Sequence, residues 1–247
     1  MSNYTSNDII NAIAAAAKAL EARKDEINRL NVFPVPDGDT GTNMSLTLAM
    51  VVDNLAKLPI GASSEDRRRA ITTGALMGAR GNSGVITSQI MRGLCEGIAD
   101  HEEFDIVAVD DAFSRAVEVA FNAVRKPVEG TILTVLRDTA TAAHKARKKK
   151  MELDEGLQFI VGESYASVQR TPELLPVLKE NGVVDAGGFG IAIFFDSFVA
   201  SLTGRAEAMV DELAFARTAA PKVEIEQIND WEGSKYKYCN EFLVNSE

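Results

Sequence analysis

Cysteine, histidine and tryptophan are scarce in this sequence, whose 247 residues include two cysteines, two histidines and one tryptophan. Cys95 and Cys239 lie far apart in dissimilar surroundings, which argues against a disulfide framework or a paired-cysteine metal site and fits a reducing compartment. The sequence does not start with a basic segment followed by an apolar run, and the most apolar stretch, 190–202, is interrupted by Asp196. We therefore expect neither a signal peptide nor a membrane span, and we expect a cytoplasmic protein.

Positive charge is also in short supply, since the formal net charge is -10 at pH 7. This excess of acids argues against a nucleic-acid-binding surface. The basic run 145–150 follows a helical pattern, so we interpret it as exposed cations in the last turn of a helix. An anionic ligand of so acidic a protein would have to be held by a metal ion, helix N-termini and a few placed donors.

Alternating strand patterns are absent up to about residue 202, and apolar residues recur there with the helical period of about 3.6 residues. Ser6 or Asn7 is expected to cap a first helix whose apolar stripe continues toward Leu30, and Pro34 and Pro36 end it. The stripe comprises Ile9, Ile10, Ile13, Ala17, Leu20, Ile27 and Leu30.

A second helix is expected to open at Thr42 or Asn43, and Ser63 with Asp66 resembles a capping box for the third. The side chains expected to point inward from the second helix are Met44, Leu46, Val51 and Leu55. The remaining helices are predicted at 67–78, 83–98, 107–124, 131–149, 155–169, 172–180 and 189–202. About eight antiparallel helices with short links predict an all-α bundle or barrel over residues 1–204.

The character of the sequence changes after Gly204, where 205–221 is charged and alanine-rich like a linker. The segments 223–225 and 236–239 alternate like β-strands, so residues 222–247 are predicted to begin a second domain. That domain would be incomplete, because a chain of fewer than roughly 40 residues rarely buries enough surface to fold alone. Within it, Cys239 would either join a metal site or remain a buried thiol.

The most specific segment runs from Asn31 to Met44 and contains Asp37-Gly38-Asp39. Two carboxylates separated by one flexible glycine can turn toward a single hard cation such as Mg2+. The residues that follow lead into a helix, so their N–H groups and hydroxyls are candidate phosphate ligands beside the metal. The alternative interpretation is an acidic turn whose Asp and Asn side chains act only as caps.

A second glycine-rich segment, 78–84, lies between two helical patterns. Gly81 would allow a ligand to approach closely, and Asn82 and Ser83 would offer donors at a helix start; the alternative is a turn with a serine cap. The segment lacks the Gly-Lys-Ser/Thr ending of a P-loop. Arg80 would neutralise a transferring phosphoryl group, or else remain a solvated partner of the helix dipole.

Two further segments, 126–131 and 182–190, place Gly with Thr131 or Asp185 just before a helix. Alternate loops of an up-and-down bundle gather at one end, so all four segments are expected to meet around one ligand. Thr131 would then contact a phosphate and Asp185 a ribose or base edge, although each residue equally suits a plain helix cap.

The segments NVFPVPDGDTGTNM, LMGARGNSGV, KPVEGTILTV and GVVDAGGFG occur in this order. Together they resemble the N-terminal domain of the bacterial fatty acid kinase catalytic subunit, which is related to the nucleotide-binding subunits of dihydroxyacetone kinase. The resemblance covers roughly the first four-fifths of the chain, and 231–243 also resembles the start of the middle domain of the fatty acid kinase subunit. It implies a barrel of eight antiparallel helices with Mg-nucleotide, as ATP or ADP, at one rim.

Carried over to this sequence, the resemblance implies that Asp37 and Asp39 bind the metal. The upstream aspartate of the dihydroxyacetone kinases is missing, and Asn31 is the nearest substitute, which leaves the number of metal ions open. Asp37, Asp39 and Arg80 are thus the candidate catalytic residues. The candidate nucleotide-binding residues are Thr40, Gly41, Thr42, Asn43, Met44, Gly81, Asn82, Ser83, Gly130, Thr131 and Asp185.

The reaction implied is transfer of the ATP γ-phosphoryl group to a fatty acid carboxylate that a separate fatty-acid-binding protein presents. A carboxylate is already ionised near neutral pH and needs no general base, in keeping with His101 and His144 lying outside every motif. Two alternatives stay open: a kinase of dihydroxyacetone or another small polyol, and a module that only senses nucleotide. A homodimer formed through the full-length protein also stays open.

Overall fold

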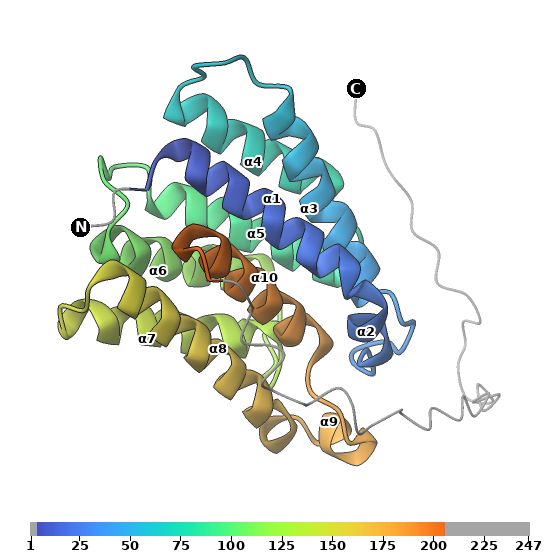
Figure 1. Ribbon diagram of the computed structural model, residues 1–247. Helices are drawn as coiled ribbons and strands as arrows, with labels where there is room; N and C mark the ends of the chain where they lie inside the picture. Colours follow the sequence, from blue (N-terminus) through green and yellow to red (C-terminus); the bar gives the residue numbers. More distant parts are fainter. Residues whose placement is uncertain (1–3, 206–247) are drawn as a thin grey trace.

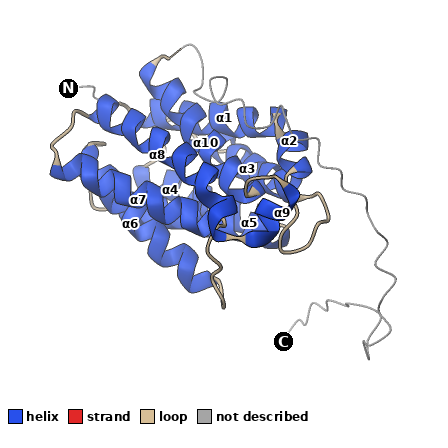
Figure 2. Ribbon diagram, turned by 90° about the horizontal axis from the view of Figure 1, so that it is seen from below, coloured by secondary structure: helices blue, strands red, loops and turns tan. Residues whose placement is uncertain are grey.

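The computed structural model describes residues 4–205, and all regular structure in that range is helical (Figure 2). The predicted all-α class is therefore confirmed, whereas the predicted linker, the strands at 223–225 and 236–239, and Cys239 lie outside the described residues. The helices of the described range are α1 (Ser6–Ala22), α2 (Lys24–Arg29), α3 (Thr40–Ala56), α4 (Ser64–Gly78), α5 (Gly81–Gly97), α6 (Ile106–Ala123), α7 (Ile132–Lys148), α8 (Leu153–Leu174), α9 (Pro176–Asn181) and α10 (Ala186–Thr203).

The long helices form a closed barrel (Figure 1). Going round it, α1 packs on α3, and α4, α5, α6, α7, α8 and α10 follow, each beside the next, until α10 meets α1. Neighbours run in opposite directions, so α3, α5, α7 and α10 all begin at one rim. The short helices α2 and α9 lie in the connections that lead to α3 and α10.

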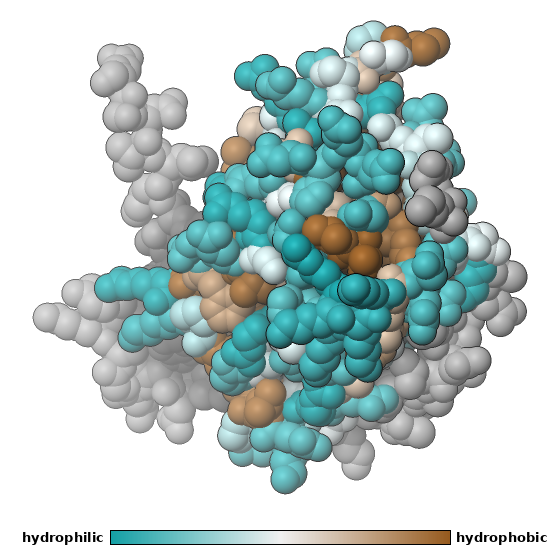
Figure 3. All heavy atoms as spheres, turned by 90° about the vertical axis from the view of Figure 1, so that its left-hand side faces the viewer, coloured by the Kyte–Doolittle hydropathy of each residue, from teal (hydrophilic) through white to brown (hydrophobic). Residues whose placement is uncertain are grey.

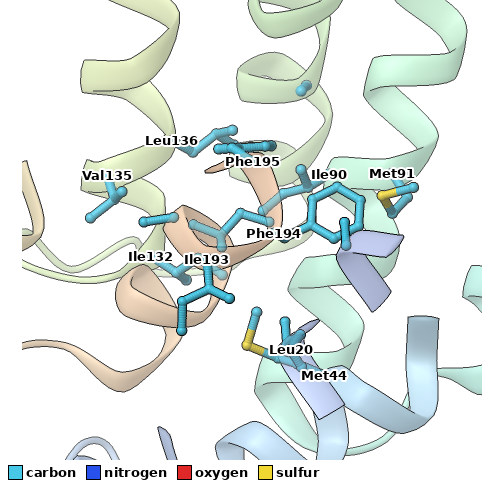
Figure 4. Packing of buried hydrophobic residues seen from close by; sticks show 14 of the residues in the cluster. Leu20, Met44, Ile90, Met91, Ile132, Val135, Leu136, Ile193, Phe194 and Phe195 are labelled. Atoms are coloured by element: carbon cyan, nitrogen blue, oxygen red, sulfur yellow. The ribbon is translucent and has the colours of Figure 1, made fainter. Parts of the chain in front are cut away.

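Helix α10 supplies much of the core, because most of its residues are buried. Figure 4 shows Ile193, Phe194 and Phe195 of α10 among side chains of α1, α3, α5 and α7. Phe195 also meets the ring of Phe113 edge to face, with centroids 5.0 Å apart. Within the described part of the chain, α10 alone has the length and apolarity of a membrane span, yet 78% of it is buried in the interior, as expected for a core helix.

One carboxylate lies within this apolar helix. Asp196 is fully buried, accepts a hydrogen bond from the Tyr165 hydroxyl at 3.1 Å and forms an ion pair with Arg205. Burial, together with the negative charge of Asp196, raises the pKa of Tyr165, so the hydroxyl keeps its proton and remains a donor. The charge of Asp196 is therefore compensated by the Tyr165 hydroxyl of α8 and by Arg205, which follows α10.

Helix starts agree with the sequence pattern to within a few residues. The capping box of Ser63 and Asp66 is confirmed, with both reciprocal hydrogen bonds present. The first helix is capped by Thr5 with Asp8, not by Ser6 or Asn7. The second long helix begins at Thr40, before the predicted start at Thr42 or Asn43.

Two helix breaks differ from the prediction. Pro172 lies inside α8 rather than at a helix start, because the Thr171 hydroxyl donates to the Val168 carbonyl, at 2.6 Å, in place of the missing proline N–H. The helix ends two residues later, before Pro176. The first predicted helix is divided at Arg23, whose guanidinium pairs with Glu26 and lies over the Phe189 ring.

Most predicted inward-facing residues of α3 are buried, but Leu46 is 49% exposed and was wrongly assigned to the core. At the far end of the barrel, the basic run that ends α7 is exposed, apart from Ala146, as predicted. The face of the molecule drawn in Figure 3 is mostly hydrophilic around a small hydrophobic area.

Candidate functional site

A pocket of about 550 Å³ opens at the rim where α3, α5, α7 and α10 begin. The four loops singled out in the sequence all contribute to it, so their predicted convergence is confirmed. Its polar and charged lining residues are Asn31, Asp37, Asp39, Thr40, Asn82, Ser83, Arg125, Lys126, Thr131 and Asp185. Apolar side chains of the same loops, among them Phe33, Val35, Val85 and Val128, complete the lining.

The acidic pair lies on the loop between α2 and α3. Gly38 has a φ of +67°, a left-handed conformation that glycine adopts without strain, and it lets both flanking carboxylates face the pocket. Burial raises the pKa of Asp39, and the neighbouring Asp37 carboxylate raises it further. Two carboxylates that repel each other at a pocket wall are a natural place for a cation.

The surrounding donors fit Mg2+. The described residues contain no cluster of three or more His, Cys, Asp or Glu side chains, so Asp37 and Asp39 must be supplemented by other oxygens. Asn31 is almost fully buried, and its amide donates to Asp37 at 2.7 Å, which places a third oxygen-bearing side chain beside the pair. Mg2+ commonly takes one or two carboxylates together with water and substrate phosphates, and this set meets that need.

Asn43 has an unsatisfied donor at this point. Its Nδ2 is buried without a hydrogen-bond partner of ordinary geometry, although the amide is near enough to lower the pKa of Asp39. A Cβ on Gly81 would lie 2.4 Å from the same nitrogen. The orphaned amide therefore lies between the acidic pair and the start of α5, buried behind the residues that line the pocket.

The first turn of α3 is held in place by a residue of α2 that was not predicted from the sequence. Asn28 of α2 accepts hydrogen bonds from the Gly41 and Thr42 N–H groups at 2.8 and 3.1 Å, and its amide donates to the Thr42 hydroxyl. Gly41 and Thr42 do not line the pocket, and Asn28 already engages their N–H groups, so their phosphate role stays a prediction that this geometry does not favour. Asn28 gave no signal in the sequence, because it belongs to an ordinary amphipathic stretch.

The Met44 side chain lies in the core, fully buried and in contact with α10, and does not line the pocket. Thr40 does line the pocket, and its carbonyl accepts a long hydrogen bond, 3.4 Å, from the Ser83 hydroxyl. The starts of α3 and α5 are thus joined at the wall of the pocket.

At the start of α5, no side chain caps the helix. Gly81, Asn82 and Ser83 line the pocket, so the first-turn N–H groups of this helix lie at its wall. Arg80 is exposed and does not line the pocket, in contrast to its predicted catalytic role. Its guanidinium donates to the carbonyls of Met77 and Ala79, at 3.1 and 2.7 Å, and so caps the end of α4.

The loop before α7 contributes Thr131 to the pocket, but Gly130 lies behind the wall. Gly130 has a φ of +82°, and a Cβ there would meet the Thr171 carbonyl of α8 at 2.9 Å, so its role is close packing. The Thr131 hydroxyl donates to the Val128 carbonyl at 2.7 Å. The same loop brings Arg125 and Lys126 to the pocket. Lys126 begins the segment singled out from the sequence, but no role was predicted for it or for Arg125.

Asp185 is buried at the start of α10, where it accepts a hydrogen bond from the Gly188 N–H at 2.7 Å. Its own N–H donates to Thr171, the residue that compensates for Pro172. The cap interpretation and the pocket interpretation are therefore compatible, since Asp185 caps α10 and also lines the pocket.

Asp185 should make stability depend on pH. Burial raises its pKa to about 6, above the ordinary 3.8, so the folded protein holds the proton more tightly than the unfolded chain. The resulting stabilisation is complete below about pH 4 and is lost as the pH rises through about 6. Asp185→Asn keeps an acceptor and cannot ionise. The free energy of unfolding of this variant should therefore rise relative to that of the wild type as the pH goes from 4.5 to 7.5, by on the order of 2 kcal/mol. Urea unfolding at both pH values measures this gain, and parallel pH profiles would contradict it.

Comparison with known proteins places this site in a family. Residues 34–200 match the DAK2 domain. An uncharacterized protein of Staphylococcus haemolyticus is 40% identical over 236 residues, 94% of this chain and 42% of its own length. An uncharacterized protein of Staphylococcus aureus is 40% identical over 237 residues, again 94% and 42%. The chain thus spans about two fifths of the length of these curated relatives.

Solved structures share the fold at low sequence identity. Dihydroxyacetone kinase from C. freundii in complex with AMP-PNP and Mg2+ matches with a TM-score of 0.59 and 16% identity, over 81% of this chain and 34% of that one. The native form of the same enzyme gives 0.58 and 15%, over 81% and 35%. The match of the family model spans more than half of the sequence and includes the acidic pair and all three glycine-containing loops that follow it. This chain belongs to the DAK2 domain family.

Proposed function

We propose that this chain is the nucleotide-binding domain of a fatty acid kinase, holding Mg-ATP in the rim pocket. One observation carries the proposal: Asp37 and Asp39 repel each other at the pocket wall, and the unpartnered amide of Asn43 lies between them and the uncapped start of α5. The acidic pair can bind a cation, and the hydrogen-bond donors without partners can bind an anion that contacts the same cation. The dihydroxyacetone kinase with this fold was solved with AMP-PNP and Mg2+, which supports the same ligands here.

Each wall of the pocket has a distinct role in this proposal. Asp37, Asp39 and Asn31 hold the metal ion, which when bound neutralises phosphate charge. The N–H groups of Gly81 to Ser83 bind phosphate oxygens, and the buried Asn43 amide lies behind them. Thr40 and Thr131 lie beside them, and Asp185 lies toward the nucleoside.

The proposed acceptor is a carboxylate. One of its oxygens forms a bond to the γ-phosphorus while the bond from that phosphorus to the β,γ-bridging oxygen breaks, giving an acyl phosphate and ADP. No proton is transferred, so no general base is needed. This agrees with a pocket whose lining includes no histidine. Both histidines instead contact aspartates of α6, His101 with Asp111 and His144 with Asp110.

We further propose that a separate fatty-acid-binding protein presents the acyl group and that the reaction takes place in the cytoplasm, where its product would enter phospholipid synthesis. A polyol kinase would need the partner to supply a base and a group that holds the polyol. The two acceptors therefore predict chemically different products, and a domain that only senses nucleotide predicts none.

The nature of the product tests the proposal. The full-length protein is incubated with γ-labelled ATP and Mg2+, and with a partner protein loaded either with fatty acid or with dihydroxyacetone. We expect label in an acyl phosphate, which hydroxylamine converts to a hydroxamate. A hydroxylamine-resistant phosphate formed only with dihydroxyacetone would indicate the polyol kinase. Tight nucleotide binding without either product would indicate the sensing module.

A further inference from the structure

The proposed reaction requires positive charge that the predicted residues do not supply. A bound triphosphate adds several negative charges to a pocket that already contains the Asp37 and Asp39 carboxylates. A metal ion offsets only part of this charge, and phosphoryl transfer generally uses Arg or Lys on the group in flight. Arg80, the cation predicted for this role, is engaged with carbonyls at the end of α4 and lies outside the pocket.

Two other cations do reach the pocket. Arg125 and Lys126, just beyond the end of α6, are the only Arg or Lys residues among the described residues that line it. Both are exposed, and within residues 4–205 neither has an ion-pair or hydrogen-bond partner. Six other arginines of the same range, Arg23, Arg92, Arg115, Arg137, Arg147 and Arg170, are paired with carboxylates on the barrel surface.

The acid of the same loop is engaged away from these cations. Glu129, three residues after Lys126, pairs with Arg137 of α7 through two hydrogen bonds of 2.6 and 2.7 Å and accepts a third from Thr134. Arg137 accordingly holds the pKa of Glu129 below its ordinary value. The loop therefore keeps its acid paired with Arg137, and no carboxylate of residues 4–205 pairs with its two cations.

The far half of the loop is fixed, which limits where the cations can go. Gly130 packs against the Thr171 carbonyl and Leu175, and the Gly130 N–H donates to the Thr134 hydroxyl at 2.9 Å. Pro127 follows Lys126 and restricts the backbone between the cations and this anchor. The loop is thus held at the end of α6 and at the start of α7, with Arg125 and Lys126 at the pocket between these points.

We propose that Arg125 and Lys126 bind the terminal phosphoryl group of ATP and carry its charge while it passes from the bridging oxygen of ADP to the acceptor oxygen. The inference rests on the proposed nucleotide site and assigns the cationic role to the loop before α7 instead of to Arg80. A cation that merely complements the end of α6 would affect stability but would not distinguish ATP from ADP.

That distinction provides a test that needs no turnover. Calorimetry on the 247-residue chain in Mg2+ measures the Kd of AMP-PNP and of ADP for the wild type and for Arg125→Gln, Lys126→Gln and the double variant. We expect each single variant to lose about tenfold in affinity for AMP-PNP and less than about twofold for ADP. Lys148→Gln, an exposed cation at the opposite end of the barrel, is the matched control, and thermal melting verifies folding.

The outcomes are separable. Equal losses for both nucleotides, or a double variant with the wild-type ratio of affinities, would overturn the role of Arg125 and Lys126 alone. A selective loss in Arg80→Gln with none in the loop variants would return the role to Arg80. A wild-type chain that binds neither nucleotide would overturn the proposed function and this inference together.

Discussion

Replacing Asp39 by alanine is expected to weaken Mg2+-dependent binding of AMP-PNP by at least about 100-fold, since even outer partners of metal ligands are worth about 10- to 100-fold. The physical reason is the loss of one of two carboxylates that face the pocket. The stability of the free protein should not fall, because the Asp39 side chain makes no capping hydrogen bond to α3 and its negative charge is repelled by that of Asp37. Binding would fall while the melting temperature stays the same or rises.

Calorimetry with and without Mg2+, paired with thermal melting, measures both effects. Asp39→Asn should behave like the alanine variant, because an amide keeps the size but loses the charge that holds the cation. Asp53→Ala is the matched control, since Asp53 lies on the same helix and only pairs with Lys57 on the surface. Wild-type affinity in Asp39→Ala would rule out the assigned metal site.

The second large effect is expected at Gly41. A Cβ at this position would lie 2.3 Å from the Lys24 carbonyl oxygen, and 2.9 Å from the carbon atoms next to it, so α3 and α2 would have to separate. Gly41→Ala should cost on the order of 3 kcal/mol of unfolding free energy, the upper range for overpacking. It should also disturb the hydrogen bonds that the Gly41 and Thr42 N–H groups donate to Asn28, and thereby weaken nucleotide binding.

Urea unfolding followed by circular dichroism measures that cost. Gly162, in the middle of α8, is exposed and has no neighbour within 4 Å of an added Cβ, so Gly162→Ala is the comparison. That variant should be stabilised by about 0.5–1 kcal/mol, the helix preference for alanine over glycine. Similar effects of the two substitutions would show that the contact between Gly41 and Lys24 is not as tight as described.

Much of the fold was predictable because local signals agreed with the barrel. The Ser63 and Asp66 box marks a helix start whatever surrounds it, and the apolar period identifies the inner face of nearly every helix. The failures occurred where a tertiary contact decides. Pro172 stays within a helix because Thr171 replaces its missing donor, and α1 stops at Arg23, where the side chain pairs with Glu26 and Phe189.

The site, too, was predictable from local sequence signals but not where tertiary contacts decide. The four loops were identifiable because each combines glycine with a helix-start residue, and such loops meet at one end of an up-and-down barrel. Which donors remain free was not identifiable, because Asn28 engages Gly41 and Thr42 from another helix. The direction of Arg80 follows from its hydrogen bonds to the carbonyls of the preceding helix end, and the sequence pattern gave no sign of it. The position of Arg125 at the pocket depends on elements that are distant in sequence.

Because neighbouring helices of the barrel run in opposite directions, their connections gather at two ends. These two ends should differ in how well they tolerate insertions and deletions. Every connection that begins α3, α5, α7 or α10 contributes to the pocket. The connections at the opposite end only turn the chain; Ile60 projects fully into solvent there, and Gly61 has open space around it. Insertions and deletions at that end would leave the pocket untouched, whereas a change of one residue in length at the pocket end would shift a ligand. Variation in loop length across the family should therefore be concentrated at the end without the pocket.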